Sequence, residues 1–422
     1  MSSYAQSLVF QLMSRLRHGS LTVRNGGQSH TFGEANSDLH AVIDVRHPRF
    51  FTRLLHEGET GAGTSYQDGD WSSPDLVAVI RLACRNMGAI ESTNLVWSAL
   101  GRFVQKLRHK LRPNSIDGAR QNIADHYDLS NDLFRLFLDE RMMYSSAVYD
   151  HAGQSLEEAQ FNKIDRICRK LQLKPGDHVL EIGTGWGGFA LHAAREYGCR
   201  VTTTTISRQQ HAYAQALLSE QLPDPSRVTL LLEDYRNLRG RFDRIVSIEM
   251  FEAVGLRYYD DFFSACDRLL APHGAMLLQT IAMQEQRFDA YRANADWIQK
   301  VIFPGGELAS VRHILASLGR ATTLNLGHAE DIGLSYALTL EEWRRRFLAK
   351  LPEVFALGFD ERFARTWEYY LAYCEGAFRE RHVQTFQLLL TKHRNLDRLF
   401  HEPVDASGEQ AHACPPRARA RQ

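Results

Sequence analysis

The chain of 422 residues is 44% hydrophobic and 24% charged, which fits a folded protein of two domains and excludes a disordered or fibrous one. Lysine plus arginine balances aspartate plus glutamate at 50 each, so no overall positive field points to nucleic acid as a partner. The six cysteines lack C-x-x-C spacing, which predicts neither disulfides nor a metal site. The chain starts without a basic leader, and no apolar run approaches a membrane span, so we expect a cytoplasmic protein.

The N-terminal part combines a hairpin with helical segments. Residues 20–33 alternate apolar and polar side chains on both sides of Asn25-Gly26-Gly27, which predicts a β-hairpin whose turn needs positive φ angles. Helical patterns follow at residues 50–55 and 76–87. We therefore assign residues 1–112 to a small α+β domain.

A basic helix is expected at residues 101–112, where this domain ends. Its positive side chains are Arg102, Lys106, Arg108, Lys110 and Arg112. Such a run is usually a solvated helix face. Each charge would also contribute about 1 kcal/mol of attraction near an anionic membrane. We favour peripheral contact with the inner membrane surface.

Strand and helix patterns alternate from residue 178 onward. Strands are predicted in "HVLEIGTG", "RVTTTTIS", "RVTLLLED", "DRIVSIEM" and "GAMLLQTIAM", with amphipathic helical segments between them. This rhythm predicts a doubly wound, mostly parallel α/β sheet. We assign residues 113–400 to this domain and residues 401–422, which lack periodicity, to a disordered tail.

A short amphipathic pattern precedes the sheet. It consists of Leu133, Phe134, Leu136 and Phe137. The same residue types would serve either as core packing or as the wall of an acyl-chain tunnel, and the pattern does not separate the two.

Four glycines fall within six positions after the first strand of the sheet. Gly183, Gly185, Gly187 and Gly188 would let backbone N–H groups approach a ligand closely, because no side chain stands in the way. Dinucleotide enzymes carry a similar loop, but they place an acid about 20 residues further on, and "VTTTTISRQQ" has none. A purely structural glycine turn is the second alternative.

The next two strand ends indicate which ligand the loop holds. One supplies the uncharged hydrogen-bonding side chains of Thr205, Ser207 and Gln210, and the other supplies Glu233, Asp234 and Tyr235. Polar groups for a ribose and an acid with an aromatic ring for an adenine are the layout of an S-adenosylmethionine site.

Longer motifs make a family resemblance visible. The chain contains "HYDLSNDLFRLFLDERMMYSSAVYD", "LEIGTGWGG", "TISRQQ", "DRIVSIEMFEAVG", "IFPGG", "LTLEEWRRRF" and "TWEYYLAYCEGAFRER". In this order they resemble the cyclopropane-fatty-acyl-phospholipid synthase family, over residues from about Ser20 to Arg394. The resemblance implies a class I methyltransferase (Rossmann-like) domain. It also implies that the smaller N-terminal domain makes lipid and homodimer contacts.

The resemblance also assigns roles to individual residues. It implies that Tyr144, Ser145, Glu181 and Ile206 join the S-adenosylmethionine site.

It further implies a bound bicarbonate that acts as the base, organised by Glu252 and Tyr336, with Cys374 close to it. Many bacterial members have a cysteine and a histidine where this chain has Ser146 and Gln279. Plant-type members resemble this chain at both positions, and serine and glutamine can still donate hydrogen bonds to an anion. Each of these five residues has a structural alternative, as a helix-cap neighbour, a half-buried tyrosine or polar packing.

The implied reaction adds a methylene from S-adenosylmethionine across the cis double bond of an acyl chain in a membrane phospholipid. Transfer leaves a carbocation, and the position of the base decides the product. A proton taken from the new methyl group closes a cyclopropane ring, whereas a proton taken elsewhere leaves a methyl-branched or exomethylene fatty acid. A non-catalytic lipid-binding protein is the alternative from another class.

Overall fold

The computed structural model describes residues 2–88 and 130–395. Three predictions lie outside the described residues: the domain boundary near residue 112, the tail at 401–422 and the basic run, which comprises Arg102, Lys106, Arg108, Lys110 and Arg112. Among the described residues, no helix combines the length and the apolar character that crossing a bilayer would require.

The N-terminal unit is a four-stranded sheet, in the order β2-β1-β3-β4, with helices packed on it. Its elements are α1 (Ser2–Met13), β1 (Ser20–Asn25), β2 (Gln28–Gly33), β3 (His40–Val45), α2 (Arg49–Glu57), α3 (Glu59–Gln67), β4 (Trp71–Ser72) and α4 (Leu76–Arg85). Asn25 pairs with Gln28, and the two glycines between them have φ angles of 55° and 81°. The predicted hairpin is therefore confirmed, with both turn residues in the region that glycine favours.

The second unit is built on a seven-stranded sheet in the order β10-β11-β9-β8-β5-β6-β7. Its strands are β5 (His178–Ile182), β6 (Arg200–Thr205), β7 (Val228–Leu232), β8 (Phe242–Ile248), β9 (Leu270–Met283), β10 (Leu324–Asp331) and β11 (Val383–Lys392). Strand β11 runs antiparallel to both of its neighbours, and the pairs from β9 to β7 are parallel. The predicted doubly wound, mostly parallel fold is confirmed, while β10 and β11 were not foreseen.

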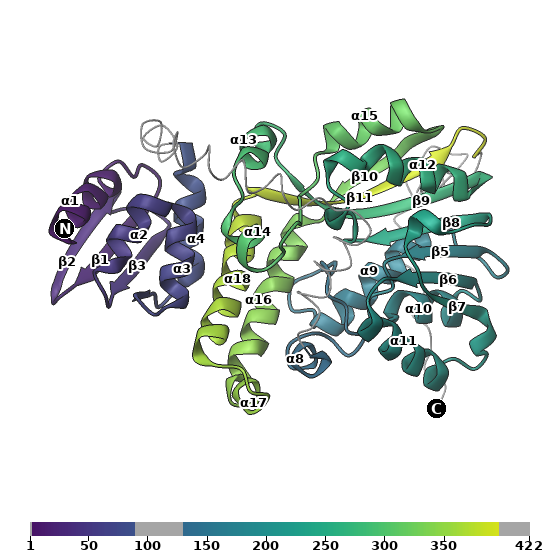
Figure 1. Cartoon of the computed structure of the whole chain (residues 1–422), viewed down its shortest axis with the longest axis horizontal. Helices are drawn as coiled ribbons and strands as arrows, with labels where there is room; N and C mark the ends of the chain where they lie inside the picture. Colours follow the sequence, from purple (N-terminus) through teal and green to yellow (C-terminus); the bar gives the residue numbers. More distant parts are fainter. Residues whose placement is uncertain (1, 89–129, 396–422) are drawn as a thin grey trace, which may run out of the picture.

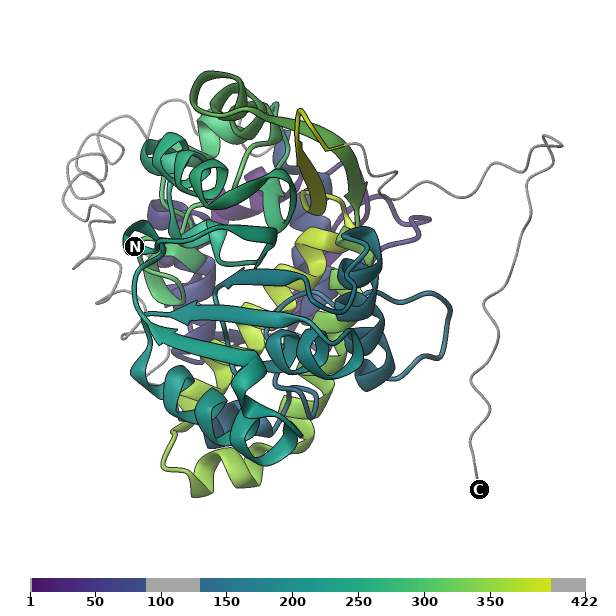
Figure 2. The same ribbon diagram turned by 90° about the vertical axis from the view of Figure 1, so that its right-hand side faces the viewer.

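Helices cover both faces of this sheet, as Figure 2 shows from the end of the molecule that carries it. One face holds α9 (Leu156–Lys170), α10 (Gly188–Glu196) and α11 (Arg208–Gln221), and the other holds α12 (Tyr259–Leu269) and α15 (Val311–Ala321). Successive residues of β5 pack into different hydrophobic cores, one on each face of the sheet. Val179 packs with the α9 side and Leu180 with the α12 side, as the two-residue period of a strand requires.

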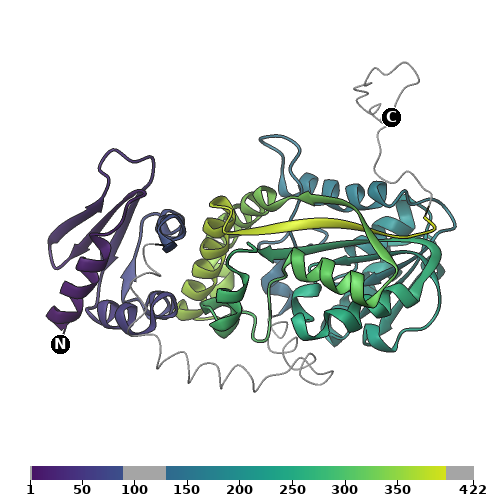
Figure 3. The same cartoon turned by 90° about the horizontal axis from the view of Figure 1, so that it is seen from above.

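The remaining elements lie around the sheet or between the two units. They are α8 (Asn131–Arg135), η1 (Pro225–Arg227), η2 (Tyr235–Asn237), η3 (Phe251–Ala253), η4 (Leu256–Tyr258), α13 (Phe288–Ala293), α14 (Trp297–Val301), α16 (Gly333–Ala349), α17 (Leu351–Ala356) and α18 (Glu361–Arg379). Helices α16 and α18 stand between the N-terminal unit and the large sheet in both Figure 1 and Figure 3.

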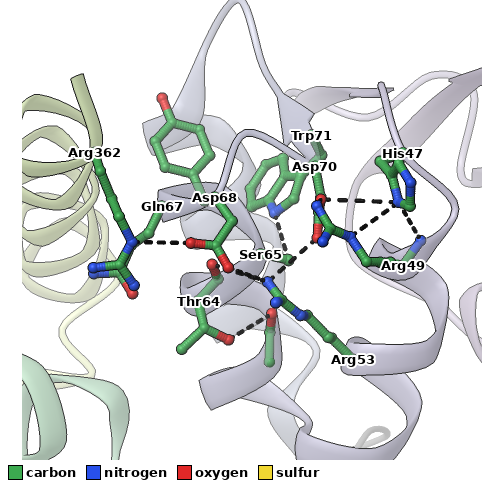
Figure 4. Close-up of polar contacts among 12 residues, drawn as sticks. His47, Arg49, Arg53, Thr64, Ser65, Gln67, Asp68, Asp70, Trp71 and Arg362 are labelled. Atoms are coloured by element: carbon green, nitrogen blue, oxygen red, sulfur yellow. Dashed lines mark hydrogen bonds and ion pairs between the residues drawn. The ribbon is translucent and has the colours of Figure 1, made fainter.

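Ion pairs fasten the N-terminal unit to α18. Asp68 accepts hydrogen bonds from Arg53, at 2.7 Å, and from Arg362 of α18, at 3.0 Å (Figure 4). Arg81 and Arg85 of α4 donate to the two carboxylate oxygens of Glu380, at 2.7 and 2.8 Å.

Small residues let the helices of the two units approach closely. A Cβ added at Gly376 of α18 would lie 2.7 Å from a methyl carbon of Ile80 in α4, and one added at Gly63 of α3 would lie 2.5 Å from the indole of Trp297. Both distances are too short for non-bonded carbon atoms. Close packing therefore holds the two units together in addition to the ion pairs.

Candidate active site

One cavity of about 1380 Å³ follows the carboxyl ends of β5, β6, β7 and β8. In a doubly wound sheet this is where ligands bind. Most of the predicted cofactor residues line it: Tyr144, Ser145, Glu181, Gly183, Gly185, Thr205, Ile206, Gln210, Glu233, Asp234 and Tyr235. Gly187, Gly188 and Ser207 are not among the lining residues.

The glycines divide into two kinds. Gly183 and Gly185 line the cavity, with φ angles of 102° and 53°. A Cβ added at Gly188 would lie 2.8 Å from the sulfur of Met143, and one at Gly187 would lie 3.2 Å from the Cβ of Ala214. The first two therefore expose backbone to a ligand, while the last two allow the start of α10 to pack closely.

The polar residues after β6 and β7 are held by one another. Thr205 donates to the side chain of Gln210 at 2.9 Å, and Ser207 caps α11 by accepting from the backbone N–H of Gln210 at 3.3 Å. Asp234 is bound by the guanidinium of Arg236 at 2.8 and 2.7 Å. The ring of Tyr235 packs edge-on against Phe262. These contacts fix the side chains around the space predicted for ribose and adenine.

A buried cation, Lys163, contacts Ser145, which lines the cavity. Lys163 of α9 is 0% exposed, and its ammonium group donates to the hydroxyl of Ser145 at 2.7 Å. Burial lowers the pKa of Lys163 to about 8, against the opposing effect of the carboxylates of Glu249, Asp139 and Glu181. Burial also raises the pKa of Glu181 to about 8, although Thr203 donates to it at 2.6 Å.

Three of the five predicted catalytic residues, Ser146, Gln279 and Tyr336, contact a carboxylate that the sequence interpretation did not include, that of Glu249. Its Oε1 accepts from the backbone N–H of Ser146 at 2.9 Å and from Nε2 of Gln279 at 2.8 Å. Its Oε2 accepts from the hydroxyl of Tyr336 at 2.8 Å. Glu249 follows β8 directly, lines the cavity, and has a φ angle of 49°, which is uncommon for a residue other than glycine.

A chain of side-chain amides sets the direction of one of these bonds. Lys170 donates to Oε1 of Gln387 at 2.7 Å, and Nε2 of Gln387 donates to Oε1 of Gln279 at 2.9 Å. An ammonium group can only donate. Each amide must therefore accept on the side of Lys170 and donate on the other, so that Gln279 presents its NH₂ group to Glu249.

Glu252 also lines the cavity but has different partners. Its Oε1 accepts from the backbone N–H of Ile281 at 2.5 Å and from the hydroxyl of Thr280 at 3.0 Å. Its Oε2 is buried and has no hydrogen-bond partner among the described residues. Burial, together with the charge of Glu249, raises the pKa of Glu252 to about 8.

Cys374 lies on α18 and lines the cavity. Burial raises the pKa of its thiol far above the usual range, so the sulfur stays protonated and neutral at physiological pH. On the same helix, the hydroxyl of Tyr370 lies 2.9 Å from that of Tyr144, which ties a predicted cofactor residue to the helical side of the cavity.

The cavity continues from this polar end into the N-terminal unit. Apolar side chains line that part, among them Leu16, Leu54, Val79 and Ile80. The pattern at residues 133–137 takes no part in it. Leu133, Phe134 and Phe137 are fully buried and pack into the core, Phe134 against Tyr144 and Trp186, so the core interpretation is confirmed there.

Sequence reasoning missed two residues of this site, Glu249 and Lys163. Glu249 had a usable signal, because an acid directly after a buried strand of a parallel sheet lies at the ligand-binding edge. Lys163 had none, because lysine on an amphipathic helix is almost always exposed. Among residues 2–88 and 130–395, no cluster of histidine, cysteine or acidic residues could hold a metal ion.

Comparisons with known proteins agree with this geometry. The family model described as mycolic acid cyclopropane synthetase matches residues 114–388. The cyclopropane-fatty-acyl-phospholipid synthase of Escherichia coli (strain K12) is 41% identical over 362 residues, which cover 85% of this chain and 89% of that protein. The tuberculostearic acid methyltransferase UfaA1 of Mycobacterium tuberculosis is 40% identical over 347 residues, covering 81% of this chain and 80% of that protein.

A solved structure also matches. The mycolic acid cyclopropane synthase CmaA1, complexed with SAH and CTAB, has a TM-score of 0.60 and 33% identity, and the match covers 67% of this chain and 100% of that one. The family model spans more than half of the chain. The protein is therefore an S-adenosylmethionine-dependent methyltransferase of the cyclopropane synthase type, and the chain belongs to the mycolic acid cyclopropane synthetase family.

Proposed function

We propose that the protein adds a methylene from S-adenosylmethionine to the cis double bond of an acyl chain in a membrane phospholipid, forming a cyclopropane fatty acid. One observation carries this proposal. A single cavity contains the glycine loop and the acidic residues at one end and the apolar side chains of the N-terminal unit at the other. Its volume of about 1380 Å³ exceeds the roughly 300–1,000 Å³ usual for one small ligand.

The cofactor end fits S-adenosylmethionine. Gly183 and Gly185 line the cavity without a side chain, and Glu233, Thr205 and Gln210 supply polar groups. When bound, S-adenosylmethionine supplies an electrophilic methyl group. An isolated double bond is a weak nucleophile with no acidic proton, so the residues of the chain must position it and keep water out. The apolar lining of the rest of the cavity suits both tasks.

The bicarbonate implied by the resemblance has no place in the reaction that we propose. Three groups assigned to hold it are Ser146, Gln279 and Tyr336. The side chains of Gln279 and Tyr336 already donate to the carboxylate of Glu249, at 2.8 Å each. Ser146 reaches that carboxylate only through its backbone N–H, at 2.9 Å, and its hydroxyl donates to the backbone carbonyl of Ala147 at 2.9 Å. The residues present therefore do not fit a free anion at that position, and no step is routed through one.

A methyl-branched or exomethylene product is the second candidate for the same cofactor and substrate. A relative at 40% identity is named a methyltransferase and one at 41% a cyclopropane synthase, so similarity does not choose between the two. The position of the base relative to the carbocation decides which proton is removed, and that proton decides the product.

Product analysis tests the proposal. The purified protein is incubated with S-adenosylmethionine and vesicles of a cis-unsaturated phospholipid, and the added CH₂ mass and the olefinic protons are measured by mass spectrometry and NMR. Added mass without olefinic protons is expected. Added mass with surviving olefinic protons would favour the second candidate, and no added mass would favour a non-catalytic lipid-binding protein.

We also propose that residues 1–112 make the lipid and homodimer contacts, that residues 113–400 carry the chemistry, and that the protein visits the cytoplasmic surface of the membrane. The sequence support is the basic run that contains Lys106 and Arg108. Replacing both with alanine should weaken binding to anionic vesicles by about 1 kcal/mol per charge at low salt. Unchanged binding would contradict the membrane proposal, and sedimentation of the protein as a monomer would contradict the dimer.

A further inference from the structure

We propose that the carboxylate of Glu249 is the general base of the reaction and occupies the place that the family resemblance gives to a bound anion. This inference rests on the proposed function, because it names the group that accepts the proton of that reaction. It differs from the sequence interpretation, in which the base is a bicarbonate organised by Glu252 and Tyr336.

The donors around Glu249 form the first argument. They come from three segments remote from β8 in the sequence: the backbone N–H of Ser146, the amide of Gln279 and the hydroxyl of Tyr336. Hydrogen bonds to a carboxylate favour its ionised form. A set of donors able to hold a free planar anion thus surrounds a carboxylate that the chain itself supplies.

The direction of the amide chain is the second argument. Because Lys170 can only donate, Gln387 and Gln279 are oriented so that an NH₂ group reaches Oε1 of Glu249. An NH₂ group in that position needs an acceptor. The amide chain therefore presents a hydrogen-bond donor, and not an acceptor, to residue 249.

The backbone gives the third argument. Glu249 has a φ angle of 49°, a conformation that costs a residue with a Cβ about 1–2 kcal/mol. Strain of this kind is concentrated at functional sites. The next residue, Met250, lies against the cofactor loop, since a Cβ added at Gly183 would be 3.0 Å from the Cβ of Met250. The strained turn thus holds the carboxylate beside the loop that carries the methyl donor.

The surrounding charges leave Glu249 as the ionised member of a pair of acids. Burial raises the pKa of both Glu249 and Glu252, and the donors and the charge of Lys163 oppose this effect at Glu249. Glu252 has an oxygen without a partner among the described residues. The charge of Glu249 raises the pKa of Glu252 further. Near neutral pH the pair therefore shares one proton, which resides on Glu252.

The step balances without any further reactant. The π electrons of the double bond form a new C–C bond to the sulfonium methyl carbon as its bond to sulfur breaks, which leaves S-adenosylhomocysteine and a carbocation on the acyl chain. Glu249 takes a proton from the new methyl group, and the electrons of that C–H bond close the ring. The neutral carboxyl of Glu249 returns its proton to water after the product leaves.

Bicarbonate dependence of turnover is the first test. Methyl transfer to a cis-unsaturated phospholipid is measured in buffer freed of carbon dioxide and again with added sodium bicarbonate. The wild-type rate should be equal in both. Glu249→Gln should lower kcat at least 100-fold, within the range for a lost general base, while the affinity for S-adenosylmethionine, measured by calorimetry, stays within about threefold of wild type and shows that the variant is folded.

A glycine substitution provides the sharper variant. Glu249→Gly suits the positive φ angle and vacates the three donors, so it should be nearly inactive without bicarbonate and at least tenfold faster with it. Glu252→Gln is the matched control, and its rate should not respond to bicarbonate. A wild-type enzyme that needs bicarbonate, or a Glu249→Gly variant that bicarbonate fails to restore, would overturn the inference.

Anion binding separates this inference from the proposed function. Carbon-13 NMR with labelled bicarbonate should detect binding to Glu249→Gly and none to wild type, with no substrate present. Absence of any methylated product from wild type would remove the proposed function, whereas bicarbonate binding by wild type at Tyr336 would remove the role of Glu249.

Discussion

The two walls of the cavity are built on different principles. The sheet wall consists of the cavity-lining residues that follow β5, β6, β7 and β8, and it is polar, charged and held by hydrogen bonds. The helical wall consists of the cavity-lining residues of α16, α18 and the N-terminal unit. It is mostly aromatic and aliphatic, with Tyr336 stacked on Phe378 and Tyr370 against Phe303.

This difference separates two tasks of one enzyme. The sheet wall must fix a charged donor and a base to within a fraction of an ångström, which directional bonds achieve. The helical wall must exclude water along a flexible acyl chain, which close apolar packing achieves without fixing any one atom. Perturbations of charge should therefore affect the first wall, and perturbations of volume the second.

Removing the buried cation should have the largest effect. Lys163→Met removes the positive charge that acts on the carboxylate of Glu249 and the hydrogen bond to Ser145, which should lower the free energy of unfolding by about 3–5 kcal/mol. Denaturation in urea measures it. Lys174→Met, at an exposed lysine, is the control and should stay within about 0.5 kcal/mol of wild type. Equal values for the two variants would show that charge does not hold the sheet wall.

A methyl group added between the two units should disturb the helical wall. Gly376→Ala places a Cβ 2.7 Å from Ile80, and overpacking of this kind should cost about 1–3 kcal/mol of unfolding free energy. Gly319→Ala, on α15 with no atom within 4 Å of the added Cβ, should instead stabilise by about 0.5–1 kcal/mol. If both variants gain stability, the contact between α18 and α4 is looser than described.

The cofactor loop should tolerate no side chain at Gly183. Gly183→Ala combines a φ angle of 102° with a Cβ 3.0 Å from that of Met250, so the dissociation constant for S-adenosylmethionine should rise at least tenfold, about 1.4 kcal/mol. Gly153→Ala has a comparable φ angle of 84° but open space around it. It should lose some stability and keep its affinity, and an equal loss of affinity would mean that backbone strain alone explains the result.

The sheet wall should also respond to pH. Burial raises the pKa of Glu181 from 4.5 to about 8, so the folded protein binds more protons than the unfolded chain between these values. The contribution of Glu181 to stability therefore falls as pH rises from about 5 to about 8. The Glu181→Gln variant has no titrating carboxyl at this position and does not lose this contribution. The difference in unfolding free energy between the variant and wild type should therefore shift in favour of the variant as pH rises. Parallel pH curves would show that the carboxyl is already ionised.

The sheet wall was the more predictable half. Its ligand residues follow directly after successive strands, so "LEIGTGWGG" and "TISRQQ" fix which groups reach the same edge once the sheet is recognised as parallel. The helical wall is made by contacts between distant segments, and only Tyr336 and Cys374 were named in it, through the resemblance. Glu249 lies in a motif that was quoted, yet its partners are 30 to 103 residues away, which no local pattern records.

The two unforeseen strands have a similar explanation. Strand β10 carries asparagine, glycine and aspartate and is largely half-buried or exposed, so its residues give a weak strand signal. Strand β11 follows the long helix α18 and mixes polar residues with one short apolar stretch at 388–390, and so short a stretch does not distinguish strand from helix by period alone. Its antiparallel insertion between β9 and β10 is a property of the whole sheet.

The amide chain that ends at Glu249 links the reaction to the outer edge of the protein. Glu330 of β10, which is partly exposed, binds Lys170, and Lys170 orients Gln387 and Gln279 in turn. An exchange at residue 330 should therefore change the hydrogen bonding at Glu249, four side chains away. A partly exposed residue of the edge strand β10 is in this way connected to the cavity, although Glu330 does not line it.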